Sequence, residues 1–198
     1  MTHAQLAKIR QHAIAEMKKS VDPQHNIDHI HRVRKNALRI VKFFKLDKVI
    51  DRNLLSAICY LHDFAFTVHR PGLLTWFLEG RLVSKRLKRL SLFDLLGIPH
   101  EEKQIIVTAI IHHPHAFPLR RLNRHRDLYS QLLQDADTLD FYSVERLTTF
   151  NVSRQLFFFY RISSHFVGIS FRLYKRNIHK YLNFPELAEH FLIHQSSI

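Results

Sequence analysis

Hydrophobic positions recur with helical spacing along nearly the whole chain. Apolar residues repeat at i, i+3 and i+4, glycine and proline are scarce, and no stretch alternates apolar and polar residues as a strand would. Breaks fall at Asp22-Pro23, at Pro71-Gly72 and before Pro114. The pattern predicts helices over residues 2–19, 27–44, 52–64, 74–90, 101–112, 126–141, 144–159, 164–181 and 185–195. We therefore expect an all-α fold, a single-domain compact helical bundle.

The length of 198 residues is that of one domain. We expect a core over residues 22–145, an N-terminal helix in residues 1–21 that packs on it, and a C-terminal helical extension of the same domain over residues 146–198. One cysteine excludes a disulfide framework and an all-cysteine metal site. No run of about 20 apolar residues suits a transmembrane helix, and no secretory signal is evident. These features predict a soluble, cytoplasmic protein; the oligomeric state is not predicted.

Polar residues inside apolar helical stretches are the informative exceptions, and the sharpest is the pair His62-Asp63 at the end of AICYLHDFA. Burying a carboxylate there costs several kcal/mol unless a cation or hydrogen bonds compensate. A divalent metal would supply that compensation, because an imidazole nitrogen and a carboxylate oxygen are both good ligands. The alternative is a helix C-terminus at which His62 favours the helix dipole and Asp63 is solvated.

A second exception is HNIDHIHRV, residues 25–33. His29 lies on the apolar face with Val33, where a hydrogen-bonded core histidine is the alternative to a ligand. His25 shares that face if the helix already includes it. If Asn26 caps the helix, His25 instead lies in the preceding loop, close to a helix N-terminus that favours anions.

A third exception is QDADTLDFY, residues 134–142, where three acids stand among apolar residues. At about 100° per residue, Asp140 falls near the middle of the apolar face and Asp137 near its edge. Asp135 falls toward the polar side, where a solvated acid is expected. A buried acid needs a partner, so Asp137 and Asp140 are the candidates for a site.

Taken in order, these three elements resemble the H…HD…D signature of the HD-domain superfamily of metal-dependent phosphohydrolases. The resemblance extends over residues 22–140 and includes the sequence context of each element. It implies the all-α fold of that family and one bound divalent metal. The implied ligands are His29, His62, Asp63 and Asp137.

Asp135 is the alternative ligand for a different register of the acidic helix, and Asp140 would then orient a neighbouring residue by a hydrogen bond. The implied metal is Mn, Fe, Co, Ni or Zn, with Mg as an alternative. Family members with two metals carry a further histidine between the HD pair and IIHHPH, in a stretch that here reads FLEGRLVSKRL, with Glu79 and no histidine. One metal is therefore expected.

The resemblance implies an enzyme that hydrolyses a phosphate ester, in the first instance that of a nucleotide, by a metal-activated water. Asp63 would bind the metal and orient or deprotonate the water. His25 and His113, the latter in IIHHPH, would face the phosphate or transfer protons, and Arg32 would neutralise phosphate charge.

The net charge of +13 also predicts anionic partners. Its basic residues form three clusters that lie outside the signature: Arg81, Lys85, Arg86, Lys88 and Arg89; Arg120, Arg121, Arg124 and Arg126; and Lys175, Arg176 and Lys180. A small phosphorylated substrate explains few of these. The alternative function is therefore a protein that binds nucleic acid or an acidic surface on an HD scaffold, with a structural or vestigial metal site.

Overall fold

Helices are the only regular elements in the described part of the chain. The computed structural model describes residues 1–114, 127–164 and 177–192. Its α-helices are α1 (His3–Met17), α2 (Ile27–Phe43), α3 (Arg52–Leu61), α4 (Leu73–Arg89), α5 (Leu92–Leu95), α6 (His100–His112), α7 (Leu128–Phe141), α8 (Val144–Leu156) and α10 (Leu187–Leu192), and its 3-10 turns are η1 (Leu46–Lys48), η2 (Phe64–Thr67) and η4 (Ile178–Lys180). The expected all-α class is confirmed for these residues.

Several helices begin at the polar residues that the sequence offers as caps. The side chain of Asn26 accepts a hydrogen bond from the backbone N–H of His29 at 2.9 Å and begins α2. Asp51, Asp127 and Ser143 cap α3, α7 and α8 in the same way. Because Asn26 is the cap, His25 lies in the loop before α2.

Some boundaries differ from those expected. Helix α3 ends at Leu61, and the expected last turn is replaced by the 3-10 turn η2. The short helix α5 was not predicted. The helix expected over residues 164–181 falls mostly outside the described residues. The basic cluster at residues 120–126 also lies outside them, and of the cluster at residues 175–180 only Lys180 is described.

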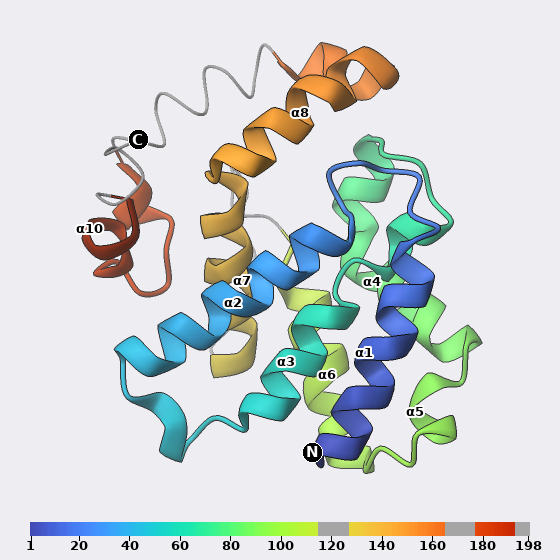
Figure 1. Ribbon diagram of the computed structural model, residues 1–198, viewed down its shortest axis with the longest axis vertical. Helices are drawn as coiled ribbons and strands as arrows, with labels where there is room; N and C mark the ends of the chain where they lie inside the picture. Colours follow the sequence, from blue (N-terminus) through green and yellow to red (C-terminus); the bar gives the residue numbers. More distant parts are fainter. Residues whose placement is uncertain (115–126, 165–176, 193–198) are drawn as a thin grey trace.

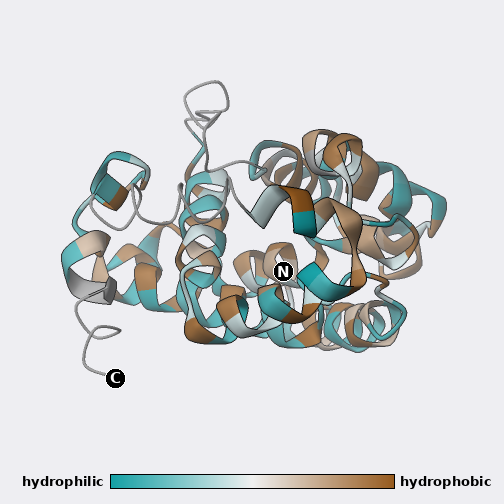
Figure 2. Ribbon diagram, turned by 90° about the horizontal axis from the view of Figure 1, so that it is seen from above, coloured by the Kyte–Doolittle hydropathy of each residue, from teal (hydrophilic) through white to brown (hydrophobic). Residues whose placement is uncertain are grey.

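Helix α3 runs through the middle of the molecule, with α1, α2, α6 and α7 packed around it (Figure 1). Every residue from Leu54 to Leu61 is buried, as expected for a helix that is apolar on all sides. Figure 2 shows that the surrounding helices carry both hydrophobic and hydrophilic residues. This packing brings the end of α3, where His62 and Asp63 follow, into the interior. Among the described residues, none of the helices combines the length and apolarity that crossing a bilayer requires.

Helices α4 and α6 cross closely at Gly80. A Cβ atom at this position would lie 2.5 Å from the carbonyl oxygen of Ile110 and 2.7 Å from Cα of Ile111. Both contacts are with backbone, which cannot move aside as a side chain would. The crossing also sets the buried Glu79 against the buried His113, three residues beyond Ile110.

We expect Gly80→Ala to destabilise the protein by about 1–3 kcal/mol, because the added methyl group must push two helices apart. Thermal unfolding followed by circular dichroism measures the change. Gly72→Ala is the matched control, since a Cβ there meets nothing within 4 Å, and we expect it to cost less than about 1 kcal/mol. Equal effects of the two substitutions would contradict the close crossing.

Candidate metal centre

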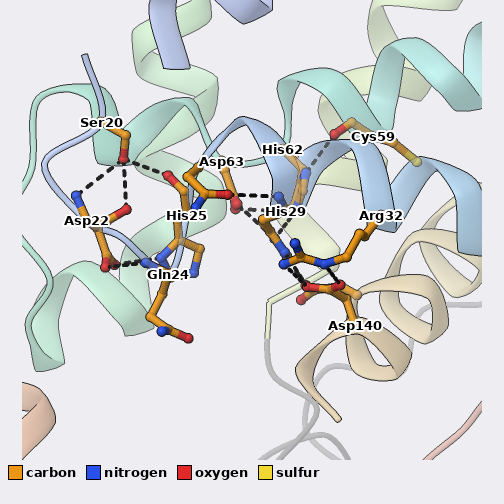
Figure 3. Close-up of polar contacts among 12 residues, drawn as sticks. Ser20, Asp22, Gln24, His25, His29, Arg32, Cys59, His62, Asp63 and Asp140 are labelled. Atoms are coloured by element: carbon orange, nitrogen blue, oxygen red, sulfur yellow. Dashed lines mark hydrogen bonds and ion pairs between the residues drawn. The ribbon is translucent and has the colours of Figure 1, made fainter. Parts of the chain in front are cut away.

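Three buried side chains from two separate helices meet in the interior, and we call them the His29–His62–Asp63 cluster (Figure 3). His29 comes from the first turn of α2, and His62 and Asp63 follow α3. Nε2 of His29 lies 3.2 Å from Nε2 of His62 and 3.0 Å from Oδ2 of Asp63. Nε2 of His62 lies 3.3 Å from Oδ1 of Asp63.

Both histidine rings are fixed by a hydrogen bond from their other nitrogen. Nδ1 of His62 donates to the backbone carbonyl of Cys59 at 2.9 Å, and Nδ1 of His29 donates to Oδ2 of Asp140 at 2.7 Å. A carbonyl or an ionised carboxylate can only accept. Neutral rings in these orientations would direct the Nε2 lone pairs of His29 and His62 toward each other. Such an arrangement requires a positive species, either a proton or a metal ion.

The pKa values of these groups agree with that requirement. Burial and the charge of Arg146 lower the pKa of His29, but Asp63 and Asp140 outweigh them and raise it to about 9. Burial lowers the pKa of His62 to about 4, and it stays neutral at physiological pH. Burial opposes ionisation of Asp63, yet the neighbouring histidines hold its pKa well below the usual range. Without a metal, the cluster therefore carries its positive charge as a proton on His29.

Asp63 and Asp137 supply the oxygen atoms of the site. Oδ2 of Asp63 is buried and faces Nε2 of His29 at 3.0 Å. Oδ1 of Asp137 lies 3.4 Å from Nε2 of His29, and its side chain is 34 % exposed, which makes it the solvent edge of the cluster. Imidazole nitrogens with a buried carboxylate oxygen form a donor set that suits borderline divalent ions. His29, His62 and Asp63 could together hold one metal ion, and Asp137 lies beside them next to His29.

Asp140 lies behind His29 and is surrounded by positive charge. Arg32 donates to it from Nε at 2.5 Å and from Nη2 at 3.2 Å, and Nη1 of Arg146 lies 3.9 Å away. Burial raises the pKa of Asp140, but His29 and the two arginines keep it well below its usual value. Asp140 thus orients His29, the role that the resemblance gives it. The guanidinium group of Arg32 is engaged with Asp140, which weighs against the phosphate-binding role expected for it.

Asp135 is placed differently from our expectation. It is fully buried, and its carboxylate accepts hydrogen bonds from the backbone N–H groups of Asn183 and Phe184 at 2.8 and 2.9 Å. The expectation of a solvated acid was wrong because the segment after η4 covers the outer side of α7. The structure brings Asp137, not Asp135, next to His29.

A buried pair, Glu79 and His113, lies close to His62 and Asp63. Nδ1 of His113 donates to the carbonyl of Ile110 at 2.7 Å, and its Nε2 lies 3.7 Å from Oε1 of Glu79. The ring centroids of His62 and His113 are 5.0 Å apart. Burial raises the pKa of the Glu79 carboxyl, while burial of His113 is outweighed by Glu79, which raises the pKa of the imidazole. His113 is therefore close to the cluster but enclosed.

His25 lies in the loop before α2, with its ring stacked on Phe66 at 3.7 Å between centroids. Its Nδ1 meets Oδ2 of Asp22 at 2.6 Å, and Nη2 of Arg146 lies 3.3 Å from its Nε2. A ring nitrogen of His25 and carboxylate oxygens of Asp63 and Glu79 lie within 4.8 Å of one another, close enough to share a cation. The structure thus brings His25 to the edge of the cluster.

Sequence reasoning missed Arg146 and gave Glu79 no role. Glu79 is the one acidic residue of α4, and this isolated acid was an available signal. Arg146 follows Val144 and Glu145 at the start of a helix and has no local feature that distinguishes it from an exposed arginine. Its buried position is visible only in the fold.

Comparison with known proteins adds no identification. No protein-family model matches the chain, and neither a curated protein nor a solved structure is significantly similar to it. The reading of the cluster therefore depends on its own geometry and chemistry.

We expect metal binding to release about one proton per ion at neutral pH, because His29, with a pKa of about 9, must lose its proton to become a ligand. Affinity should rise about tenfold per pH unit up to pH 9 and then level off. Calorimetric titration with Mn²⁺ in buffers of different ionisation enthalpy measures the released proton.

The raised pKa of His29 also determines how the stability of the folded protein changes with pH. The folded-state pKa of His29 lies above the ordinary histidine value of 6.5. Its contribution to the stability of the metal-free protein is therefore complete below pH 6.5 and is lost as pH rises through 9. Binding without proton release at pH 7 would contradict a protonated His29.

Proposed function

We propose that this chain is a metal-dependent phosphohydrolase. The observation that carries the proposal is the convergence of two Nε2 atoms at 3.2 Å beside the buried Oδ2 of Asp63. Each Nδ1 is already committed, to a backbone carbonyl in His62 and to Asp140 in His29. Metal-binding histidines characteristically have such partners on the second nitrogen. The ordered resemblance to the HD-domain signature points to the same four ligands, namely His29, His62, Asp63 and Asp137.

The cluster supports hydrolysis of a phosphate ester. A divalent ion held there would polarise a phosphoryl oxygen and lower the pKa of a bound water. Asp137 forms the exposed edge, which is the side open to a substrate. Arg146 lies near both His25 and Asp140, and its guanidinium can neutralise charge on phosphate oxygens as the phosphorus–oxygen bond breaks. A nucleotide remains the first candidate substrate, on the resemblance alone.

We expect Asp63→Asn and His62→Ala to lose bound metal and to lower turnover by at least about 10²-fold. Elemental analysis gives the metal content, and release of inorganic phosphate from a nucleotide panel with Mn²⁺ gives the turnover. Asn keeps the volume of Asp63, so circular dichroism should show a folded protein.

His3→Ala is the matched control, because His3 is an exposed histidine at the start of α1. It should keep both metal and turnover. Wild-type turnover in a metal-free Asp63→Asn protein would falsify the proposed function.

A second candidate function, binding to nucleic acid, is favoured by one observation. Arg81, Lys85 and Lys88 are all exposed, and their spacing places them on one face of α4. Of the other two basic clusters, only Lys180 lies within the described residues.

If α4 contacts nucleic acid, single-stranded RNA should bind with an affinity that falls steeply with salt. Replacing Arg81, Lys85 and Lys88 by alanine should lower the slope of log K against log salt by about 0.7 per lost phosphate contact. Fluorescence anisotropy measures both quantities. The control replaces Lys35, Lys42 and Lys45, which are exposed in and after α2. Absence of RNA binding at low salt would eliminate this candidate.

A further inference from the structure

A second buried carboxylate–histidine pair, Asp22 and His25, lies beside the metal cluster. Oδ2 of Asp22 accepts hydrogen bonds from Nδ1 of His25 at 2.6 Å and from the hydroxyl of Tyr160 at 2.5 Å. Oδ1 accepts from the backbone N–H of Gln24 at 2.9 Å. Burial raises the pKa of Asp22, but His25 and the other donors outweigh it and lower the pKa below its usual value. An ionised carboxylate is thus held in the interior with three donors around it.

The neighbours of His25 fix its tautomer. A guanidinium group has only donors, so Nε2 of His25 must accept from Nη2 of Arg146, 3.3 Å away. An ionised carboxylate only accepts, so Nδ1 must donate to Asp22. Both contacts require the proton on Nδ1 and a lone pair on Nε2. This is the arrangement in which a carboxylate orients an imidazole for service as a base.

The ring is also fixed in direction. It stacks on Phe66 with an angle of 6° between planes, and its side chain is 14 % exposed. Figure 3 shows His25 between Asp22 and the His29–His62–Asp63 cluster. A ring nitrogen of His25 lies within 4.8 Å of an oxygen of Asp63, a separation that one water molecule can bridge.

Two residues that contact the Asp22–His25 pair come from the C-terminal third of the chain. Arg146 belongs to α8, and Tyr160 lies in the helical residues 158–164 that follow it. Gln24, in the same loop as His25, donates to the hydroxyl of Ser153 at 3.1 Å and accepts from Arg146 through its backbone carbonyl. Helix α8 and the residues after it therefore hold the loop of His25 against the cluster.

We propose that His25 is the base that receives the proton of the attacking water, and that Asp22 and Tyr160 are positioning residues that fix its tautomer and direction. This inference rests on the proposed hydrolase function. In the step, Nη2 of Arg146 leaves Nε2 of His25 for a phosphate oxygen, which frees the lone pair of Nε2. An O–H bond of water then breaks, its proton passes to Nε2 of His25, and the oxygen forms a bond to phosphorus. The bond from phosphorus to the leaving oxygen breaks, the electron pair stays on that oxygen, and solvent supplies its proton. His25 then returns its proton to solvent.

The tautomer can be tested without any activity. Long-range ¹H–¹⁵N spectra of the ¹⁵N-histidine protein, assigned with His25→Ala, should show His25 protonated at Nδ1 with a strongly hydrogen-bonded proton. Tyr160→Phe removes one donor from Asp22 and should shift that proton while leaving the fold intact. A His25 ring protonated at Nε2 would overturn the proposal, whether or not the protein hydrolyses phosphate esters.

The kinetic test is a double-mutant cycle with 4-nitrophenyl phosphate and Mn²⁺. His25→Ala should lower kcat by about 10²- to 10⁴-fold, and Asp22→Asn by about 10- to 100-fold. Tyr160→Phe should have a smaller effect in the same direction. KM and metal content should stay close to wild type in all three, because none of these residues is proposed as a ligand.

The cycle separates positioning from a general structural role. In the His25→Ala background, Asp22→Asn and Tyr160→Phe should change kcat by less than about twofold, because residues that act through His25 lose their effect with it. Full effects in that background would overturn the positioning role. Two metal ions per chain, falling to one in His25→Ala, would show that His25 is a ligand and overturn its role as base. A wild-type protein that hydrolyses no phosphate ester defeats the proposed function, and the spectra still decide the tautomer.

Discussion

The mutual approach of two imidazole nitrogens in a buried space is the constraint on which the rest of the site depends. Nε2 of His29 and Nε2 of His62 lie 3.2 Å apart, and each ring is held by a hydrogen bond from its other nitrogen. Neutral rings would repel, so the geometry is stable only with a positive charge between them. A proton meets that need in the metal-free protein, and a divalent ion would meet it with two further carboxylates nearby. The same contacts thus fit both states with little rearrangement.

This constraint explains why so much charge is buried around α2 and α7. Asp140 fixes His29, and its own negative charge is balanced by Arg32 and by Arg146. A buried carboxylate without such partners would be strongly unfavourable. The network ties α2, α7 and α8 together through side chains rather than through apolar packing alone. Its members therefore have a structural role as well as the proposed chemical one, and substitution of any of them needs a check of folding.

The sequence could predict what depends on neighbours along the chain. Helix periodicity and capping residues determine where α2 begins, and an apolar helix that ends in His62-Asp63 must carry them inward. It could not predict contacts between distant segments. Asp135 was misjudged because a single helix does not reveal the segment that covers it. Arg146 reaches His25 across 121 positions and Tyr160 reaches Asp22 across 138, so no local pattern could reveal either contact.

The same arrangement occurs twice in the molecule: a carboxylate accepts a hydrogen bond from Nδ1 of a histidine. The two pairs differ in the group that faces Nε2 of the histidine. In the pair of Asp140 and His29, that nitrogen faces another imidazole and a carboxylate, where a cation belongs. In the pair of Asp22 and His25, it faces the guanidinium of Arg146, whose hydrogen bond would keep Nε2 unprotonated until the guanidinium contacts a phosphate instead. The two histidines also differ in burial, since His29 is fully buried and His25 is partly exposed. The two histidines therefore differ in what their second nitrogen meets and in how deeply they are buried.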